Sequence, residues 1–416
     1  MFKSAWGNAR VRGMLAIIVV VAALASMILM YLGWGADSLV HPRARDSMRS
    51  RWYSDEVLGG DSPASLLNAA FRSEAAVGQS GNLIDFRPAS GSETLRLVPI
   101  GKTLGNSEAW ERGDGPEPGS VGYPAVVQNA RGASADGKFY LYYAIHDPPS
   151  GIAVAIADRP EGPYRKLADL TWTRSDSRVL RAPPLPRETS HFSSPVVIWN
   201  EQEQKWFMYF HYYSNEWERN RGHQRTALAV TEDLATHRWE IWRDDRGDII
   251  SVMPTTPERW MNSQSTYHAI ARLPNSLWVA FLRGVGGTYE DGKWKQDPAM
   301  LGFAFSRDGR RWTQLANNPV LPAPERRGKT GVLRPLLFGL YRDRLLLCWG
   351  ESAYYDSNPK ARCGTTTDFV TINDIPHPIA DIDVQDGPAS VLQTSGRMLL
   401  FDGDMLYELV RPRARN

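Results

Sequence analysis

The stretch Gly151–Tyr164, "GIAVAIADRPEGPY", shows the unit from which this chain of 416 residues is built. An apolar strand leads to Asp158, turn-forming residues follow, and the aromatic Tyr164 ends the unit. The plan recurs in "TALAVTEDLATHRWE" (226–240), "LGFAFSRDGRRWTQL" (301–315) and "ARCGTTTDFVTI" (361–372). The aspartates of these units are Asp158, Asp233, Asp308 and Asp368, which are 75, 75 and 60 residues apart. This spacing indicates a structural repeat, and we interpret the aspartates as turn acceptors and not as catalytic groups.

Two further predicted strands belong to each unit, which we interpret as four-stranded. The first strands are "GYPAVVQ" (122–128), "HFSSPVVIW" (191–199), "TYHAIARL" (266–273), "VLRPLLFGL" (332–340) and "DGPASVLQ" (386–393). The second strands are "KFYLYYAIHD" (138–147), "KWFMYFHYY" (205–213), "SLWVAFLRG" (276–284), "DRLLLCWGES" (343–352) and "RMLLFDGD" (397–404). Five such units repeated radially are the blades of a β-propeller. The sequence therefore predicts an all-β fold, a five-bladed β-propeller over residues 93–416, in which Thr94–Lys102 completes the short last blade and closes the ring.

The composition narrows the class of partner. The chain contains 15 tryptophans, 16 tyrosines, 35 glycines and 28 prolines, a mixture that suits short strands joined by tight turns. Its 48 basic and 46 acidic residues leave a net charge of only +2, so no global field attracts nucleic acid. Nucleotide-binding loops and zinc spacings are missing from the sequence, so we expect no cofactor. Calcium in the channel stays an open alternative, because its ligands are oxygen atoms.

The N-terminal region carries a membrane signal. Met14–Leu32 is uncharged over 19 residues, and as a helix it would span about 28 Å, close to the thickness of a bilayer core. The apolar run continues past the small residues Ala23–Ala25, which favours a retained anchor over a cleaved signal peptide. We predict a short tail (1–13), a transmembrane anchor (14–34) and a juxtamembrane stem (35–92) with one short helix. The expected location is the inner membrane, single-pass, with the propeller in the periplasm and envelope proteins as possible partners.

The two cysteines, Cys348 and Cys363, are 15 residues apart on predicted neighbouring strands. An oxidising compartment permits a disulfide between them. Two buried free thiols are the equal alternative, since cross-strand geometry does not follow from sequence.

The hairpin followed by "AIADRPEGPY" resembles the blade plan of five-bladed propeller glycoside hydrolases, such as the family 43 arabinosidases and xylosidases and the family 32 fructosidases. The resemblance covers roughly Leu95–Leu409. "HFSSP", "MYFH" and "QRTALAVTEDL" are similar to uncharacterised bacterial glycosidase-like propeller proteins, in which an aspartate is expected after the proline. This chain has Val196 there instead. The resemblance implies a carbohydrate partner, and a catalytic role for a carboxylate at this position is in doubt.

In a propeller, the starts of the first strands and the ends of the second strands meet at one mouth of the central channel. The side chains that we expect to bind substrate there are Tyr123, His146, His191, His211, Tyr267, His268, Arg283 and Arg334. Arg334 would suit a carboxylate such as a uronic or sialic acid, or else it forms a salt bridge to a neighbouring acid. His191 and His211 would alternatively be core histidines.

Glycoside hydrolysis requires two carboxyl groups. The candidate catalytic acids are Asp147, Glu188, Glu351 and Asp386. Glu351 is the preferred general acid, because the apolar "LLLCW" before it would raise its pKa by desolvation. Asp147 and Asp386 would alternatively stabilise turns, and Glu188 would lie in a solvated loop. An acid at the start of each of the first three inner strands is not visible, so a non-catalytic site is a real alternative.

The sequence thus predicts a membrane-anchored, extracytoplasmic glycoside hydrolase-like protein that acts on a polysaccharide or oligosaccharide. The alternative is a non-catalytic carbohydrate-binding or scaffold propeller in an envelope or exopolysaccharide assembly machine. "SRDGRRW" (306–312) also resembles the Asp-box of sialidases. That box has one more residue between Asp and Gly, and a sialidase would have six blades, so we rank this third interpretation below the others.

Overall fold

A computed structural model describes the protein in segments. The described residues are 62–72, 83–86, 95–112, 122–145, 150–170, 176–182, 191–213, 224–253, 259–291, 293–322, 325–326, 329–341, 343–353, 360–375, 379–380, 389–394 and 397–410. The predicted tail (1–13) and anchor (14–34) lie outside these ranges. Within them, no helix combines the length and apolar character needed to cross a bilayer.

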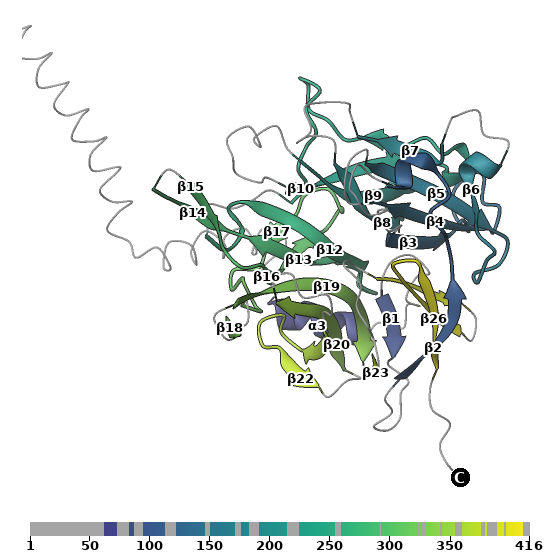
Figure 1. The fold of residues 1–416 in the computed structure, drawn as a ribbon. Coiled ribbons are helices and arrows are strands. Elements are labelled where there is room, and N and C mark those ends of the chain that lie inside the picture. The colour runs from purple at the N-terminus through teal and green to yellow at the C-terminus, as the bar shows by residue number, and fades with distance from the viewer. Residues whose placement is uncertain are drawn as a thin grey trace, which may run out of the picture. The chain divides into compact units, whose positions relative to one another are not determined.

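Most of the described residues form five mainly antiparallel sheets, which are the blades of a propeller (Figure 1). Blade 1 contains β3 (Gly122–Gln128), β4 (Phe139–Ala144), β5 (Gly151–Ala157), β6 (Arg165–Lys166) and β7 (Arg178–Arg181). Blade 2 contains β8 (Phe192–Asn200), β9 (Lys205–Tyr213), β10 (Gln224–Thr231) and β11 (Glu240–Ile241). Blade 3 contains β12 (Gln264–Arg272), β13 (Trp278–Val285), β16 (Met300–Ser306) and β17 (Thr313–Gln314). Blade 4 contains β19 (Lys329–Tyr341), β20 (Arg344–Ala353), β21 (Lys360–Thr366) and β22 (Asn373–Ile375). Blade 5 contains β24 (Ser390–Thr394), β25 (Arg397–Asp402), β26 (Met405–Val410), β2 (Leu95–Lys102) and β23 (Ile379–Ala380), the last two pairing in parallel.

Smaller elements accompany the blades. They are α3 (Pro63–Arg72), β1 (Leu83–Phe86), the hairpin β14 (Gly287–Glu290) and β15 (Lys293–Gln296), and β18 (Glu325–Arg326). Short 3₁₀ turns occupy Ala109–Arg112, Leu167–Asp169, Leu234–Thr236 and Arg259–Met261.

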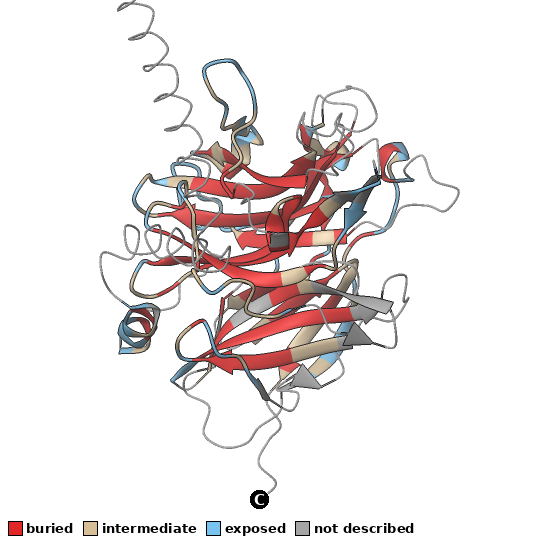
Figure 2. Cartoon of the chain, turned by 90° about the vertical axis from the view of Figure 1, so that its left-hand side faces the viewer, coloured by how far each residue is buried: buried red, intermediate tan, exposed pale blue. Residues whose placement is uncertain are grey.

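In the part of the chain that the structure describes, the core consists of five hydrophobic clusters, and each cluster joins two neighbouring blades. Representative pairs are Tyr142 with Phe210 (blades 1 and 2), Tyr209 with Trp278 (2 and 3), Phe281 with Trp349 (3 and 4), Leu346 with Leu400 (4 and 5), and Phe401 with Leu141 (5 and 1). Consecutive strand residues such as Tyr209 and Phe210 enter different clusters, because side chains alternate between the two faces of a sheet. Both faces are therefore buried, as the red strand centres in Figure 2 show, and five interfaces among five blades close the ring.

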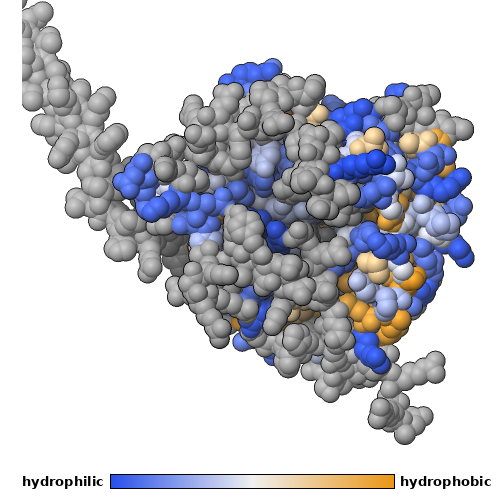
Figure 3. Space-filling model, in the orientation of Figure 1, coloured by the Kyte–Doolittle hydropathy of each residue, from blue (hydrophilic) through white to orange (hydrophobic). Residues whose placement is uncertain are grey.

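The strand that closes the ring comes from the N-terminal side of the propeller. β2 pairs antiparallel with β26, with Leu97 opposite Leu409 and Lys102 opposite Met405. This confirms the predicted role of Thr94–Lys102. β2 also has exposed apolar side chains, Val98 and Ile100, at 43% and 42% exposure. Hydrophilic residues cover much of the described surface in Figure 3, and apolar colour gathers towards the side where Figure 1 draws β2.

Two elements before β2 pack against the propeller as well. Helix α3 begins after Ser62, whose Oγ accepts a hydrogen bond from the Ser65 N–H (3.1 Å). Leu66 and Leu67 of this helix are buried in the cluster between blades 3 and 4. Strand β1 pairs in parallel with β19, with Leu83 opposite Phe338. Both elements fall in the segment 35–92 that the sequence assigns to a stem, so part of that segment contacts the propeller.

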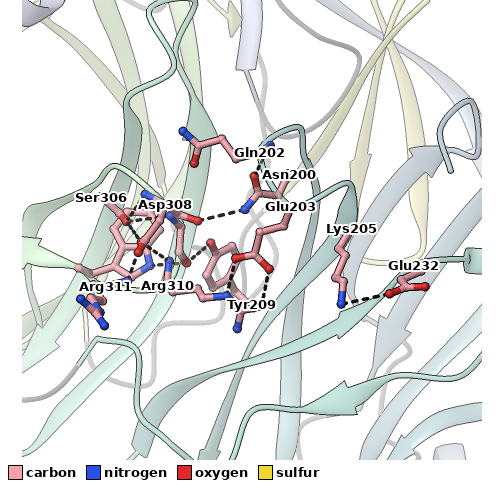
Figure 4. Close-up of polar contacts among 12 residues, drawn as sticks. Asn200, Gln202, Glu203, Lys205, Tyr209, Glu232, Ser306, Asp308, Arg310 and Arg311 are labelled. Atoms are coloured by element: carbon pink, nitrogen blue, oxygen red, sulfur yellow. Dashed lines mark hydrogen bonds and ion pairs between the residues drawn. The ribbon is translucent and has the colours of Figure 1, made fainter.

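The repeated aspartates stabilise turns by accepting hydrogen bonds, as Figure 4 shows for Asp308. Its Oδ1 accepts hydrogen bonds from the N–H groups of Arg310 (2.8 Å) and Arg311 (2.9 Å). Burial acts to raise the pKa of Asp308, but these N–H groups and the Ser306 hydroxyl hold it below its ordinary value. Asp368 makes the same kind of bonds in blade 4, and Asp233 accepts from the Ala235 N–H. The structural interpretation is confirmed for these three.

The Asp308 turn also joins blade 3 to blade 2. Asn200 Nδ2 donates to the carbonyl of Asp308 (3.0 Å), and the Tyr209 hydroxyl donates to the carbonyl of Gly309 (2.6 Å). Arg310 forms a two-point ion pair with Glu203 at 2.5 and 2.6 Å (Figure 4). This repeat turn therefore serves the interface as well as its own blade.

Cys348 and Cys363 form a disulfide, with an S–S distance of 2.06 Å. They lie directly opposite each other on β20 and β21, and both are buried. Of the two alternatives that the sequence left open, the structure therefore contains the disulfide.

Candidate functional site

The inner strand of each of blades 1 to 4 contains a bulge. The pairing shifts between Gly122 and Ala125, Ser193 and Val196, Thr266 and His268, and Pro335 and Leu337. Three of these bulges contain a non-glycine residue with positive φ, namely Tyr123 (52°), Ser194 (51°) and Tyr267 (44°). Such a backbone costs energy in an L-residue, and strained residues concentrate at functional sites.

Tyr267 is the centre of a group of side chains drawn from four blades. Its ring lies 4.9 Å from His211 of blade 2 and 6.1 Å from Tyr123 of blade 1, measured between ring centres. The guanidinium carbons of Arg283 (blade 3) and Arg334 (blade 4) lie 4.9 and 5.5 Å from the centre of the same ring. We call Tyr123, His191, His211, Tyr213, Tyr267, Arg283 and Arg334 the Tyr267 cluster.

Two histidines in edge-to-edge contact form one side of this cluster. The rings of His191 and His211 lie nearly in one plane, at 9°, with centres 4.6 Å apart and Nε2 atoms 2.5 Å apart, so the two Nε2 atoms face each other. One ring donates its Nε2–H to the other at this contact. Tyr213 packs on His191 with ring centres 4.7 Å apart. The two histidines, at the two ends of one hairpin, are thus buried together beside Tyr267.

Six of the eight predicted binding residues therefore lie in one place. His268 has different surroundings: its Nδ1 is 3.3 Å from the Thr226 hydroxyl, and its ring packs on Tyr209 in the blade 2–3 interface. Complete burial lowers the pKa of His268 to about 3, so the ring is neutral at physiological pH. His146 lies outside the described residues. A sugar-binding role for these two stays a prediction.

Sequence reasoning did not single out Tyr213. The available signal was its position two residues after His211, because alternate residues of a strand share a face. Arg225 is another buried cation near the mouth, at 6% exposure. It donates to the carbonyls of Ser263 and Gln224, so it holds β10 against the segment that leads into β12.

Of the four candidate catalytic acids, Glu351 lies within the described residues, whereas Asp147, Glu188 and Asp386 lie outside them. Glu351 is 3% exposed, near the mouth end of β20, and its Oε2 accepts a hydrogen bond from Arg362 Nη1 at 3.2 Å. Asp402, at the end of β25, is equally buried. The second strands of blades 4 and 5, β20 and β25, thus each carry a buried acid near the end that the sequence places at the mouth.

Val196 stands where the resemblance places an acid. It is 2% exposed and belongs to the cluster between blades 2 and 3 with Ile198 and Ile270. An apolar residue suits this position, because an unpaired carboxylate there would lose its hydration. In the described part of the protein, no three His, Cys, Asp or Glu side chains are grouped as metal ligands.

The class that these observations define is a five-bladed β-propeller with an aromatic and cationic cluster drawn from four of its blades. No protein-family model and no curated protein matches the sequence. A solved structure named "Glycoside hydrolase" is similar, with a TM-score of 0.50, 15% identity and coverage of 76% of this chain and 92% of that chain. A second solved structure, named as a complex of BT0996 and RGII, has a TM-score of 0.51 at 14% identity, covering 76% and 92%.

A third solved structure, a putative glycosidase from Bacteroides thetaiotaomicron, has a TM-score of 0.48 at 14% identity and covers 83% of this chain and 98% of that one. At these identities the likeness is one of fold. The five-bladed propeller fold, predicted from the repeats, is therefore confirmed.

Proposed function

We propose that this protein binds an oligosaccharide or polysaccharide at the Tyr267 cluster. The observation that carries the proposal is the meeting of side chains from four blades on one tyrosine ring. Aromatic faces suit the apolar faces of sugar rings, and imidazole, phenol and guanidinium groups suit sugar hydroxyls. The shared propeller architecture of glycoside hydrolases supports the same class of ligand.

We further propose that the protein is anchored in the inner membrane by residues 14–34, with the propeller in the periplasm. The apolar length of that segment supports the anchor. The Cys348–Cys363 disulfide supports an oxidising compartment, because cytoplasmic thiols are kept reduced. Envelope proteins that handle the same polymer would be its neighbours there.

Binding is tested with the full-length protein in detergent against a panel of neutral and acidic glycans. Tyr267→Asn removes the aromatic ring, while asparagine tolerates the left-handed backbone found at this position. Loss of a buried aromatic anchor costs about 2 kcal/mol, so the dissociation constant should rise about 30-fold. Gln204→Asn is the matched control, because Gln204 also has positive φ (54°) but lies in the β8–β9 turn.

Two outcomes would reject the proposal. One is that no glycan of the panel binds, and the other is that Tyr267→Asn and Gln204→Asn bind equally well. Thermal unfolding of each variant establishes that a loss of binding does not come from a loss of folding.

Hydrolysis is the second candidate, and the buried acids Glu351 and Asp402 at the mouth favour it. The usual mechanism requires two carboxyl groups, one as acid and one as base or nucleophile. Wild-type protein should then release reducing ends from a bound glycan, and Glu351→Gln should abolish release while it preserves binding. Release that continues unchanged in Glu351→Gln removes Glu351 from the mechanism, and the lack of any release by the wild type leaves binding as the function.

A further inference from the structure

Helix α3 and strand β1 precede the ring in sequence and pack against blades 3 and 4. Leu66, Leu67 and Ala70 of α3 belong to the hydrophobic cluster between these two blades. Asn275, in the turn between β12 and β13, donates a hydrogen bond from its Nδ2 to the carbonyl of Leu66 (2.8 Å). Leu83 of β1 belongs to the same hydrophobic cluster. We call α3 and β1 together the N-terminal brace.

β1 lies on the inner side of the ring. The first strand of each blade contacts the first strands of both neighbouring blades, so these five strands surround the axis of the ring: β3, β8, β12, β19 and β24. β1 pairs with β19 on the edge opposite β20, and it also contacts β24. The brace therefore extends the sheet of blade 4 towards the axis and contacts blade 5 there.

The hydrophobic cluster that holds the brace extends to the Tyr267 cluster. Phe281 of β13 belongs to the hydrophobic cluster, and Arg283 lies two residues further along the same face of this strand. Arg283 is also directly opposite Leu301 of β16, which is itself a member of the hydrophobic cluster. A packed interface therefore connects Leu67 and Leu83 of the brace with a cationic side chain of the Tyr267 cluster.

The shape of the Tyr267 cluster depends on how blades 3 and 4 pack. Tyr267 and Arg283 come from blade 3, whereas Arg334 comes from blade 4, and its guanidinium carbon lies 5.5 Å from the centre of the Tyr267 ring. Protein interiors are close-packed, so the loss of side chains from one part of an interface shifts its other parts. The brace supplies four buried apolar side chains to this interface, so its docking should influence the distance between Arg334 and Tyr267.

We infer that the N-terminal brace positions the Tyr267 cluster for its ligand, and that docking of the brace and binding of a glycan strengthen each other. The inference rests on the proposed function, because it concerns the support of the same site. Coupling of this kind is reciprocal: if the docked brace increases the affinity for the glycan by some factor, the glycan stabilises the docked brace by the same factor. The brace thereby links the N-terminal segment of the chain to the state of the site.

The test measures the glycan affinity of the full-length protein in detergent by isothermal titration calorimetry. The probes are xylotriose, mannotriose and trigalacturonate, and the tightest binder is used for the variants. Leu67→Asp places a carboxylate in the hydrophobic cluster between blades 3 and 4 and should detach α3. The dissociation constant should then rise at least about fivefold, which is the lower end of the usual range for coupled sites.

Two variants of α3 serve as controls. Asn68→Asp introduces the same residue at the next position, which is exposed, and Leu67→Met keeps the apolar volume. Both should bind the glycan like the wild type. Thermal unfolding is recorded for every variant, because a purely structural role of the brace would lower the melting temperature without changing the affinity of the folded protein.

Hydrogen exchange measures the reverse direction of the coupling. In the wild type, a saturating concentration of the glycan should slow the exchange of the α3 amides (Pro63–Arg72) by about the factor by which detachment of α3 weakens binding. This experiment uses the wild type, so it decides the question even if Leu67→Asp does not fold.

The outcomes separate this inference from the proposed function. If Leu67→Asp binds the glycan as tightly as Asn68→Asp does, the brace only stabilises the fold, so the inference is wrong and glycan binding stands. If the glycan leaves the exchange of the α3 amides unchanged, the coupling is absent and the inference is also wrong. If none of the three probes binds to the wild type, both proposals fall.

Discussion

Asp308 is the most informative position for a test of how the blades hold together. Replacing it with alanine removes the acceptor of the Arg310 and Arg311 N–H groups and of the Ser306 hydroxyl. Hydrogen bonds to a charged acceptor contribute about 1.5 to 3 kcal/mol each and do not add fully, so Asp308→Ala should cost about 2 to 4 kcal/mol. The loss should extend to the blade 2–3 interface, because the same turn accepts a hydrogen bond from Asn200.

Urea denaturation followed by tryptophan fluorescence measures the effect as a shift of the unfolding midpoint. Asp158→Ala is the matched control: it occupies the same place in the blade 1 repeat, but its side chain is 86% exposed and its ion-pair contact with Lys138 is 3.7 Å long. An exposed pair of this kind contributes at most about 1 kcal/mol. Equal midpoints for Asp308→Ala and Asp158→Ala would refute the argument from the turn.

The charge of Asp308 adds a pH test. Its folded pKa lies below the ordinary value of 3.8, so its charge contributes stability that is fully present above pH 3.8 and is lost as the pH falls through the folded value. Asp308→Asn keeps an acceptor oxygen without the charge. The difference in unfolding free energy between wild type and Asp308→Asn should therefore be constant from about pH 7 to 5 and shrink below pH 3.8. A difference that is as large at about pH 2.5 as at pH 7 would contradict this linkage.

Two further predictions concern covalent and ionic cross-links. Reduction of Cys348–Cys363, or replacement of both by alanine, should lower the unfolding free energy by about 3 kcal/mol, the entropy expected for a loop of 15 residues, and a midpoint unaffected by reductant would contradict this. Lys166→Met leaves the buried carboxylate of Glu111 without the ammonium that lies 2.5 Å from both of its oxygens, so we expect a loss of about 3 to 5 kcal/mol. Adding Glu111→Gln should recover part of that loss, and a double variant less stable than Lys166→Met would show that Glu111 is held chiefly by its other partners.

The five-bladed ring could be predicted from the sequence because it depends on the number of repeated units, which can be counted there. Five first strands and a fifth unit too short for a complete blade leave one strand to be supplied from elsewhere, and Thr94–Lys102 was the apolar segment in the right place. The disulfide could not be predicted from the sequence in this way. Two cysteines on neighbouring strands form one only if the register sets them opposite each other, and the pairing of β20 with β21 fixes that register.

The site was predicted as a group of residues at one mouth but not in its contacts. The sequence named both Tyr267 and His268, and simple alternation does not tell which one turns towards the channel. The bulge between Thr266 and His268 interrupts the two-residue period at this very point. A tyrosine with positive φ has no sequence signature, because tyrosine rarely adopts that backbone. The meeting of Tyr267 with Arg334 depends on neighbouring blades and so requires the tertiary structure.

The order of elements before the ring has a mechanical consequence. The polypeptide passes through α3, packed between blades 3 and 4, and then β1, paired with β19, before it reaches β2 in blade 5. A pulling force applied through the N-terminal residues would therefore load α3 and β1 first. The strand that closes the ring, β2, would carry force only after both had detached. Under such a force, α3 and β1 would therefore delay the opening of the ring.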